Sequence, residues 1–194
     1  MNKNHKISVV IAFCCKRYKT LALLLESIEL QTLSVDEVII VSDGEDSALE
    51  PIINSEKYVF LYAPKSGRPA PLRNLGISKA KNKFIAISDD DDIWHSRKIE
   101  KQMKVFDENP QVAAVFCNYL VFFDSKNINN NHKINDDYNE VSYDQLFLKN
   151  SLPLSSVIIN YNINDQCFNE DIYFRGWEDY ELWLRITEKQ KKII

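Results

Sequence analysis

Short apolar runs with strand character alternate along this chain with segments of helical periodicity. The runs at 7–12, 37–42 and 83–88 are almost continuously apolar, which is typical of strands buried on both faces of a sheet. Between the first two runs, the apolar residues of 21–28 recur at i, i+3, i+4 and i+7, as on one face of a helix. This alternation predicts an α/β fold with an open, mostly parallel central sheet flanked by helices.

Weaker signals complete this pattern. We expect further strands at 57–62, 112–123 and 154–160, helices at 71–80, 96–108 (capped by Ser96) and 176–190, a short helix within 142–150, and an Asn-rich loop at 124–140. Ligands bind beyond the carboxyl ends of the strands in such sheets, where the strand order switches. Asp43 and the aspartates that follow 83–88 lie at that edge, which is the first indication of a binding site.

Composition limits the function classes. The 194 residues, 45% of them hydrophobic, suffice for one domain over 1–194, and a net charge of −4 argues against general nucleic-acid binding. No apolar run is long enough to span a bilayer, and the apolar stretch near the start is too short for a signal peptide, so we expect a cytoplasmic protein. The four cysteines form no C-x-x-C pair, which predicts reduced thiols and no zinc site.

Four consecutive aspartates, 89–92, follow the strand at 83–88 directly. Adjacent carboxylates raise one another's pKa unless a positive group lies among them. A hard divalent cation, Mg²⁺ or Mn²⁺, prefers such oxygen ligands and binds through one or two carboxylates plus substrate phosphates. A solvated acidic turn is the alternative, but Ile93 and Trp94 follow the run and favour burial. The sequence contains no EF-hand loop, P-loop or G-x-G-x-x-G motif.

Other charged residues belong to the same edge of the sheet. Asp43 can accept a hydrogen bond from a nucleobase N–H, or it can simply form an Asp-Gly turn. Lys65, Arg68 and Arg73 come before and within the helix at 71–80. These cations can pair with phosphates or with the aspartates, and the alternative is an exposed helix face.

Four stretches in this order resemble one enzyme family. They are "ISVVIAFCCKRYKTLALLLESIELQT", "DEVIIVSDGEDS", "GRPAPLRNLGISKAKNKFIAISDDDDIWHSRKIEKQ" and "RGWEDYELWLRI". The third is similar to an Arg-Asn-x-Gly helix followed by a metal-binding D-x-D strand end, and the fourth resembles a later Glu-Asp motif. Together they resemble the nucleotide-sugar-dependent glycosyltransferases of the GT-A fold, specifically the large inverting family 2.

The resemblance implies roles for individual residues. It places Ala12 and Phe13 at the base pocket, Asp43 on the base, Arg73 near the base and phosphates, Asp90 and Asp91 beside the ribose and metal, and Asp92, with Asp90, as metal ligands. Which of the four aspartates binds Mn²⁺ or Mg²⁺ depends on the alignment frame. The family usually has a proline where Ala12 stands and a second aspartate where Ser42 stands, and both departures concern the base pocket and so the identity of the donor.

The implied reaction moves a sugar from a nucleotide-diphosphate sugar, of UDP type, to a hydroxyl of a saccharide or lipid-linked acceptor. Asp179, in the Glu178-Asp179 pair, is the implied general base, the metal stabilises the leaving diphosphate, and a single attack inverts the anomeric centre. Without the resemblance, both acids are equally well explained as partners of a helix dipole. Trp177 and Trp183 belong either to an acceptor wall or to the core, and the leucines flanking Trp183 favour the core.

Two rival functions remain. A nucleotidyltransferase shares a carboxylate-bound metal, but the cations after the first strand have no accompanying glycine loop. An inactive nucleotide-sugar-binding domain is disfavoured by the intact Glu-Asp pair. We expect 1–123 to bind the donor and metal and 124–194 to face the acceptor, in a cytoplasmic polysaccharide-synthesis enzyme. The sequence leaves open whether the chain is the catalytic part of a longer protein and whether it associates peripherally with the inner face of the membrane.

Overall fold

A computed structural model describes residues 5–14, 16–46, 48, 56–121, 137–161, 167–189 and 192–194. The loop predicted at 124–140 lies outside these residues except for 137–140.

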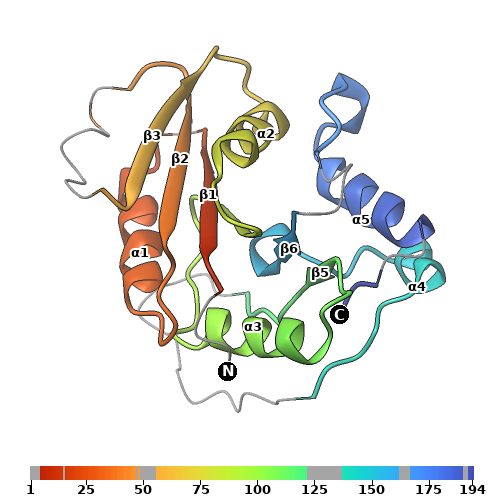
Figure 1. Ribbon diagram of the computed structural model, residues 1–194. Helices are drawn as coiled ribbons and strands as arrows, with labels where there is room; N and C mark the ends of the chain where they lie inside the picture. The colour runs from red at the N-terminus through yellow and green to blue at the C-terminus, as the bar shows by residue number, and fades with distance from the viewer. Residues whose placement is uncertain are drawn as a thin grey trace.

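Six strands form one sheet in the order β3-β2-β1-β4-β6-β5 (Figure 1). The strands are β1 (Ile7–Phe13), β2 (Glu37–Asp43), β3 (Tyr58–Ala63), β4 (Phe84–Asp89), β5 (Ala114–Val115) and β6 (Ile158–Asn160). The first four are parallel, and β6 runs antiparallel to both β4 and β5. The predicted mostly parallel α/β sheet is therefore confirmed.

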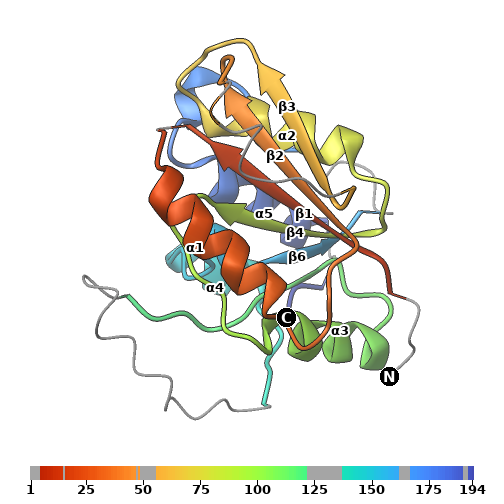
Figure 2. The same cartoon turned by 90° about the vertical axis from the view of Figure 1, so that its left-hand side faces the viewer.

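Helices cover both faces of the sheet. The α-helices are α1 (Tyr18–Glu29), α2 (Pro69–Lys79), α3 (Lys98–Glu108), α4 (Tyr143–Leu148) and α5 (Glu178–Glu188), with 3-10 turns η3 (Leu154–Ser156) and η4 (Ile172–Phe174). Alternate residues of β1 and β2 pack into two separate cores, one with α1 and α3 and the other with α2, α4 and α5. Figure 2 shows α1 in front of the sheet and α2 and α5 behind it.

The strand predicted at 112–123 is wrong over most of its length. Only Ala114–Val115 form β5, and residues 116–121 have no strand structure. On one side β5 meets β6, which has three residues, and on the other side it bridges Ile193. A strand needs a neighbouring backbone to pair with: Phe116 still donates its N–H to the Ile194 carbonyl (2.6 Å), but residues 117–121 form no ladder with the part of the chain that the structure describes.

Two element starts also differ from the predictions. The strand expected from residue 154 begins at Ile158, because Ser156 donates its hydroxyl to the Pro153 carbonyl within η3 (2.7 Å). Helix α3 begins at Lys98 after Arg97, without a side-chain cap, rather than at Ser96.

The order of the strands switches beside β1, which lies between β2 and β4. Ala12 near the end of β1 is in register with Asp89 at the end of β4. Helix α2 packs tightly on this part of the sheet, since a Cβ atom at Gly76 would lie 2.5 Å from Val10 Cγ1. This close approach fixes the N-terminal half of α2 at the carboxyl edge of the strands. None of the helices in the described ranges is both long and apolar enough to cross a bilayer.

Candidate active site

Two arginines compensate the charge of the aspartate run. Arg73 of α2 donates from Nη2 to Asp89 Oδ1 (2.8 Å). The guanidinium of Arg17, in the loop between β1 and α1, contacts the carboxylates of Asp90 and Asp91. Positive groups for three of the four carboxylates are thus supplied from two different elements of the chain.

Asp90 and Asp92 differ from free carboxylates. Asp90 has no exposed surface, and burial raises its pKa although Arg17 opposes the shift. Neither of its oxygens receives a hydrogen bond of regular geometry from the part of the chain that the structure describes. Desolvation also raises the pKa of Asp92, with repulsion from Asp89 and Asp91 adding to it and the Ser155 hydroxyl opposing it. Both groups therefore favour a cation as partner.

Arg73 also reaches the start of α5. Its Nη1 donates to Glu178 Oε1 (3.0 Å), so one buried guanidinium bridges Asp89 and Glu178. The second Glu178 oxygen accepts from the Gly176 backbone N–H (2.6 Å). Arg73 and Glu178 are each 5% exposed, and Arg73 lies over the Phe168 ring, 5.3 Å from its centroid. This buried ion pair joins the two acidic motifs into one site.

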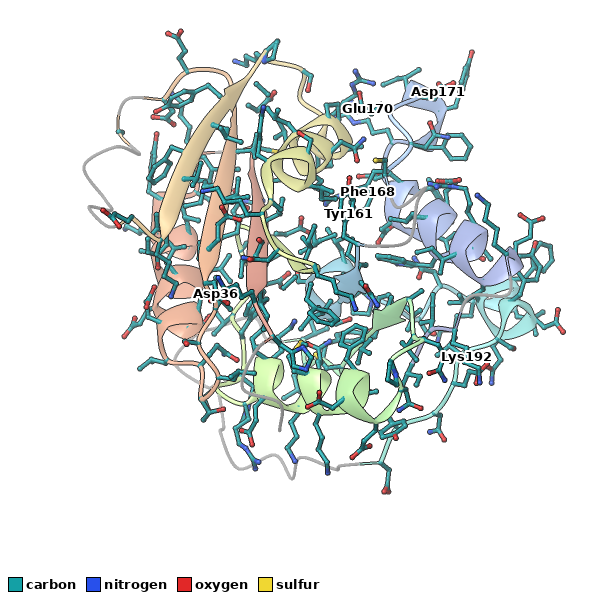
Figure 3. All side chains as sticks on the ribbon, in the orientation of Figure 1. Asp36, Tyr161, Phe168, Glu170, Asp171 and Lys192 are labelled. Atoms are coloured by element: carbon teal, nitrogen blue, oxygen red, sulfur yellow. The ribbon has the colours of Figure 1, made fainter. Side chains whose placement is uncertain are left out.

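The next residue of α2 strengthens this junction. The Asn74 amide pairs with the backbone of Phe168, donating to its carbonyl (2.9 Å) and accepting from its N–H (2.8 Å). It also donates to Glu170 Oε1 (2.7 Å). Figure 3 shows Phe168 and Glu170, on the segment that leads to α5, next to α2. The Arg-Asn-x-Gly stretch therefore has three structural tasks: Arg73 joins the acids, Asn74 holds the approach to α5, and Gly76 seats α2 on the sheet.

Asp179 is in a different position from its neighbour Glu178. It is half-buried, and its Oδ1 accepts the Tyr180 backbone N–H (2.7 Å). Burial raises its pKa, and the more distant positive charge of Arg73 opposes the shift. A carboxylate with a raised pKa binds a proton more readily at neutral pH, as a general base must.

An aromatic hollow of about 450 Å³ lies beside the start of α5. It is lined by Tyr143, Tyr173, Phe174, Trp177 and Tyr180, and by Glu181, Leu184, Arg185 and Glu188 further along α5. Trp177 is 61% exposed there, whereas Trp183 is fully buried and donates its indole N–H to the Leu152 carbonyl (3.2 Å). The core assignment of Trp183 is confirmed.

Several of the predicted donor residues make contacts within the protein. The Asp43 carboxylate accepts the backbone N–H groups of Ser66 (2.6 Å) and Gly67 (2.8 Å), and so shapes the loop before α2. Arg68 donates to the Glu170 carbonyl (2.6 Å). The side chains of Ala12 and Phe13 are buried in the two cores, so only their backbone could face a ligand.

Sequence reasoning missed Arg17 as a site residue. The sequence patterns use the cations after the first strand only to compare the chain with nucleotidyltransferases. The signal that could have identified Arg17 is its place directly after a strand that neighbours the aspartate-bearing strand.

The carboxylate oxygens suit a hard divalent cation. No group of three or more His, Cys, Asp or Glu side chains converges within the described ranges, so a closed cage of protein ligands is not formed there. The two buried Asp90 oxygens, with no regular hydrogen-bond donor in those ranges, and the exposed Asp92 nearby in the chain fit an ion that completes its shell with water and phosphate.

Curated relatives of this chain are glycosyltransferases. An uncharacterized glycosyltransferase of Rickettsia conorii is 31% identical over 95% of this chain and 30% of the relative. The Escherichia coli UDP-Glc:alpha-D-GlcNAc-diphosphoundecaprenol beta-1,3-glucosyltransferase WfaP is 28% identical over 94% of this chain and 70% of its own length. The chain spans less than a third of the length of the Rickettsia relatives that it matches first.

Solved structures share the fold. S. aureus TarS 1-349 superposes with a TM-score of 0.72 at 19% identity, over 97% of this chain and 58% of that one. The mannosyltransferase PcManGT from Pyrobaculum calidifontis, solved with GDP-Man and Mn²⁺, superposes with a TM-score of 0.71 at 14% identity, over 99% of this chain and 55% of that one. The fold is thus that of GT-A glycosyltransferases, as expected.

A family model covers most of the chain. The model of "Glycosyl transferase family 2" matches residues 8–176, from β1 to Gly176, and so ends two residues before Glu178 of the Glu-Asp pair. The chain belongs to glycosyl transferase family 2.

Proposed function

We propose that this chain is the catalytic part of an inverting glycosyltransferase that moves a sugar from a UDP-type donor to a hydroxyl of a saccharide or lipid-linked acceptor. One observation carries the proposal: the buried Arg73 bridges Asp89 of the strand-end run and Glu178 of the helix-start pair. A carboxylate run suited to a metal-bound diphosphate therefore adjoins a carboxylate suited to proton transfer.

The donor side is formed by the carboxyl ends of β1, β2 and β4. Asp90 and Asp92 would hold Mn²⁺ or Mg²⁺, which supplies Lewis-acid stabilisation of the leaving diphosphate. Arg68 lies close enough in the chain to the Asp43-shaped loop to contribute positive charge toward the phosphates, and the β1 backbone at Ala12 and Phe13 would border the base. The TarS structures include complexes with UDP and UDP-GlcNAc, which supports a UDP-type donor.

The acceptor side is formed by the start of α5. As the acceptor oxygen attacks the anomeric carbon, its proton passes to the Asp179 carboxylate, the bond from that carbon to the diphosphate oxygen breaks, and the configuration inverts. The raised pKa of Asp179 suits it to take this proton. Glu178, whose two oxygens are held by Arg73 and the Gly176 N–H, positions this pair of acids rather than reacting.

The aromatic hollow beside Trp177 supports a saccharide acceptor. Its size lies within the range of ligand pockets, and exposed aromatic faces next to charged side chains suit a molecule with both apolar and hydroxyl-bearing surfaces. The name of WfaP describes transfer to a diphosphoundecaprenol-linked sugar, and another relative, AmsE of Erwinia amylovora, is named for amylovoran biosynthesis. A lipid-linked acceptor would bring the protein to the inner face of the membrane.

A ligand panel measured by thermal shift tests the proposal. We expect UDP-sugars or GDP-sugars to raise the melting temperature with Mn²⁺ present and to raise it much less after chelation, because a ligand that binds only the folded state stabilises it. Nucleoside triphosphates alone should give no comparable shift. A response to triphosphates but not to nucleotide sugars would support the nucleotidyltransferase instead, and Mn²⁺-dependent donor binding without transfer to any acceptor would indicate an inactive binding domain.

A further inference from the structure

We propose that Arg17 is an exchangeable counter-ion of the donor site. In the structure it contacts the carboxylates of Asp90 and Asp91, and when the donor binds it leaves them to the divalent cation and pairs with the diphosphate. This inference rests on the proposed function, and it assigns a task to a residue to which the resemblance gave no role.

Arg17 lies where it can contact either the aspartates or the diphosphate of a bound donor. It follows β1, and β1 neighbours β4 at the point where the strand order switches. Asp90 has no exposed surface, whereas the Arg17 side chain that contacts it is 41% exposed. Arg17 is therefore the solvent-side member of this pair, and an ion approaching Asp90 meets its guanidinium.

The Arg17 side chain is far more exposed than that of Arg73. Arg73 is 6% exposed at its side chain, belongs to a helix, and lies between two carboxylates and an aromatic ring. Arg17 precedes the first turn of α1, and that helix has no side-chain N-cap. Its neighbour Lys16 has φ 53°, the left-handed conformation that L-residues rarely adopt, and no other non-glycine residue in the described ranges shares it. A loop that holds such a conformation can relax when its end contact is released.

The charges favour an exchange rather than joint occupancy. A divalent cation and a guanidinium that share the Asp90 and Asp91 oxygens would repel each other at short range. The donor brings its own negative charge, and the planar guanidinium fork fits phosphate oxygens bidentately. One donor molecule with its metal can thus satisfy all the groups: the carboxylates gain the metal, and Arg17 gains the diphosphate.

This exchange predicts two opposite effects of one substitution. In Arg17→Gln, Mn²⁺ added alone should bind about tenfold more tightly, since no competing charge has to be displaced, and UDP added at saturating Mn²⁺ should bind about tenfold more weakly, the usual scale for a charge-assisted contact. Calorimetry measures both affinities. Arg17→Lys, which keeps the charge but not the fork, should leave the Mn²⁺ affinity near wild type and weaken UDP.

Lys19→Gln is the matched control. It removes the same charge from an exposed position of α1 two residues away, and both affinities should stay near wild type. If Mn²⁺ affinity is unchanged in Arg17→Gln, or if Mn²⁺ and UDP both weaken, Arg17 only organises the loop and the inference fails while the proposed function stands. If wild-type protein takes up neither Mn²⁺ nor UDP, the proposed function itself fails and takes the inference with it.

Discussion

The acidic run at the end of β4 and the acidic pair at the start of α5 share the charge partner of their first member but differ in the partners of the later ones. The first member of each, Asp89 and Glu178, is paired with Arg73. Beyond that anchor, Asp90 and Asp91 face a second cation, Arg17, whereas Asp179 receives a backbone N–H from Tyr180. Aspartate thus has a guanidinium as its direct partner in one place and a backbone N–H in the other, although burial raises the pKa of both Asp90 and Asp179.

This difference separates two kinds of carboxylate chemistry. A cation beside a carboxylate favours its charged form, and such a carboxylate suits the exchange of one cation for another. A carboxylate that lacks a directly bound cation and has lost part of its hydration binds protons more readily, because desolvation disfavours its charged form. Substitutions that remove the charge of one of these acids or of its partner test this contrast.

The largest effect is expected for Asp179→Asn. An amide cannot take the acceptor proton, so sugar transfer should fall by about 10²–10⁴-fold. Mn²⁺-dependent binding of UDP should persist, because the donor side is untouched. Product formation and calorimetry on the same preparation separate the two effects. Glu178→Gln is the matched control, with a smaller loss of transfer, and wild-type turnover in Asp179→Asn would remove this residue from the mechanism.

The second effect concerns the shared anchor. Arg73→Gln leaves Glu178 buried without its charge partner, and breaking a buried pair in this way typically destabilises a protein by about 3–5 kcal/mol. Urea unfolding measures the change in the free energy of unfolding. Arg97→Gln removes a guanidinium that pairs with Glu100 on the surface of α3, and this control should change the free energy of unfolding very little. Equal losses in the two variants would show that Arg73 does not couple the acidic motifs.

The smallest effect is a pH-dependent difference in stability. The pKa of Asp179 is raised in the folded protein above its unfolded value, so the folded state binds the proton more tightly. Its ionisation therefore lowers stability as pH rises from the ordinary value through the raised value. Asp179→Asn should melt slightly above wild type at neutral pH, and the difference should vanish as acid protonates Asp179. Melting curves across this range check the sign, and a variant that melts lower at neutral pH would contradict it.

Local patterns were enough to predict the parallel strands, the acids at the end of β4 and the helix that opens with Glu178 and Asp179. Each depends on residues close together in the sequence, such as the continuous apolar run of 83–88 before the aspartates. The burial of Trp183 was likewise evident from its leucine neighbours.

The contacts that assemble the site could not be predicted in this way. Arg17 and Asp91 are 74 positions apart, and Asn74 and Phe168 are 94 apart, so no periodicity relates them. The strand at 112–123 failed for a similar reason: apolar character favours a strand, but the length of β5 depends on a partner backbone that comes from β6 and Ile193. Pairing partners are a property of the whole fold rather than of a segment.

The missing side chain at Gly76 limits how this enzyme can change shape. Because α2 lies against Val10 of β1 at Gly76, it has little room to move closer to the sheet, and Arg73 and Asn74 share that close packing. We expect adjustment to a substrate to occur more readily in the residues between β1 and α1. Substitutions intended to change donor specificity are therefore better placed in that short connection than along α2.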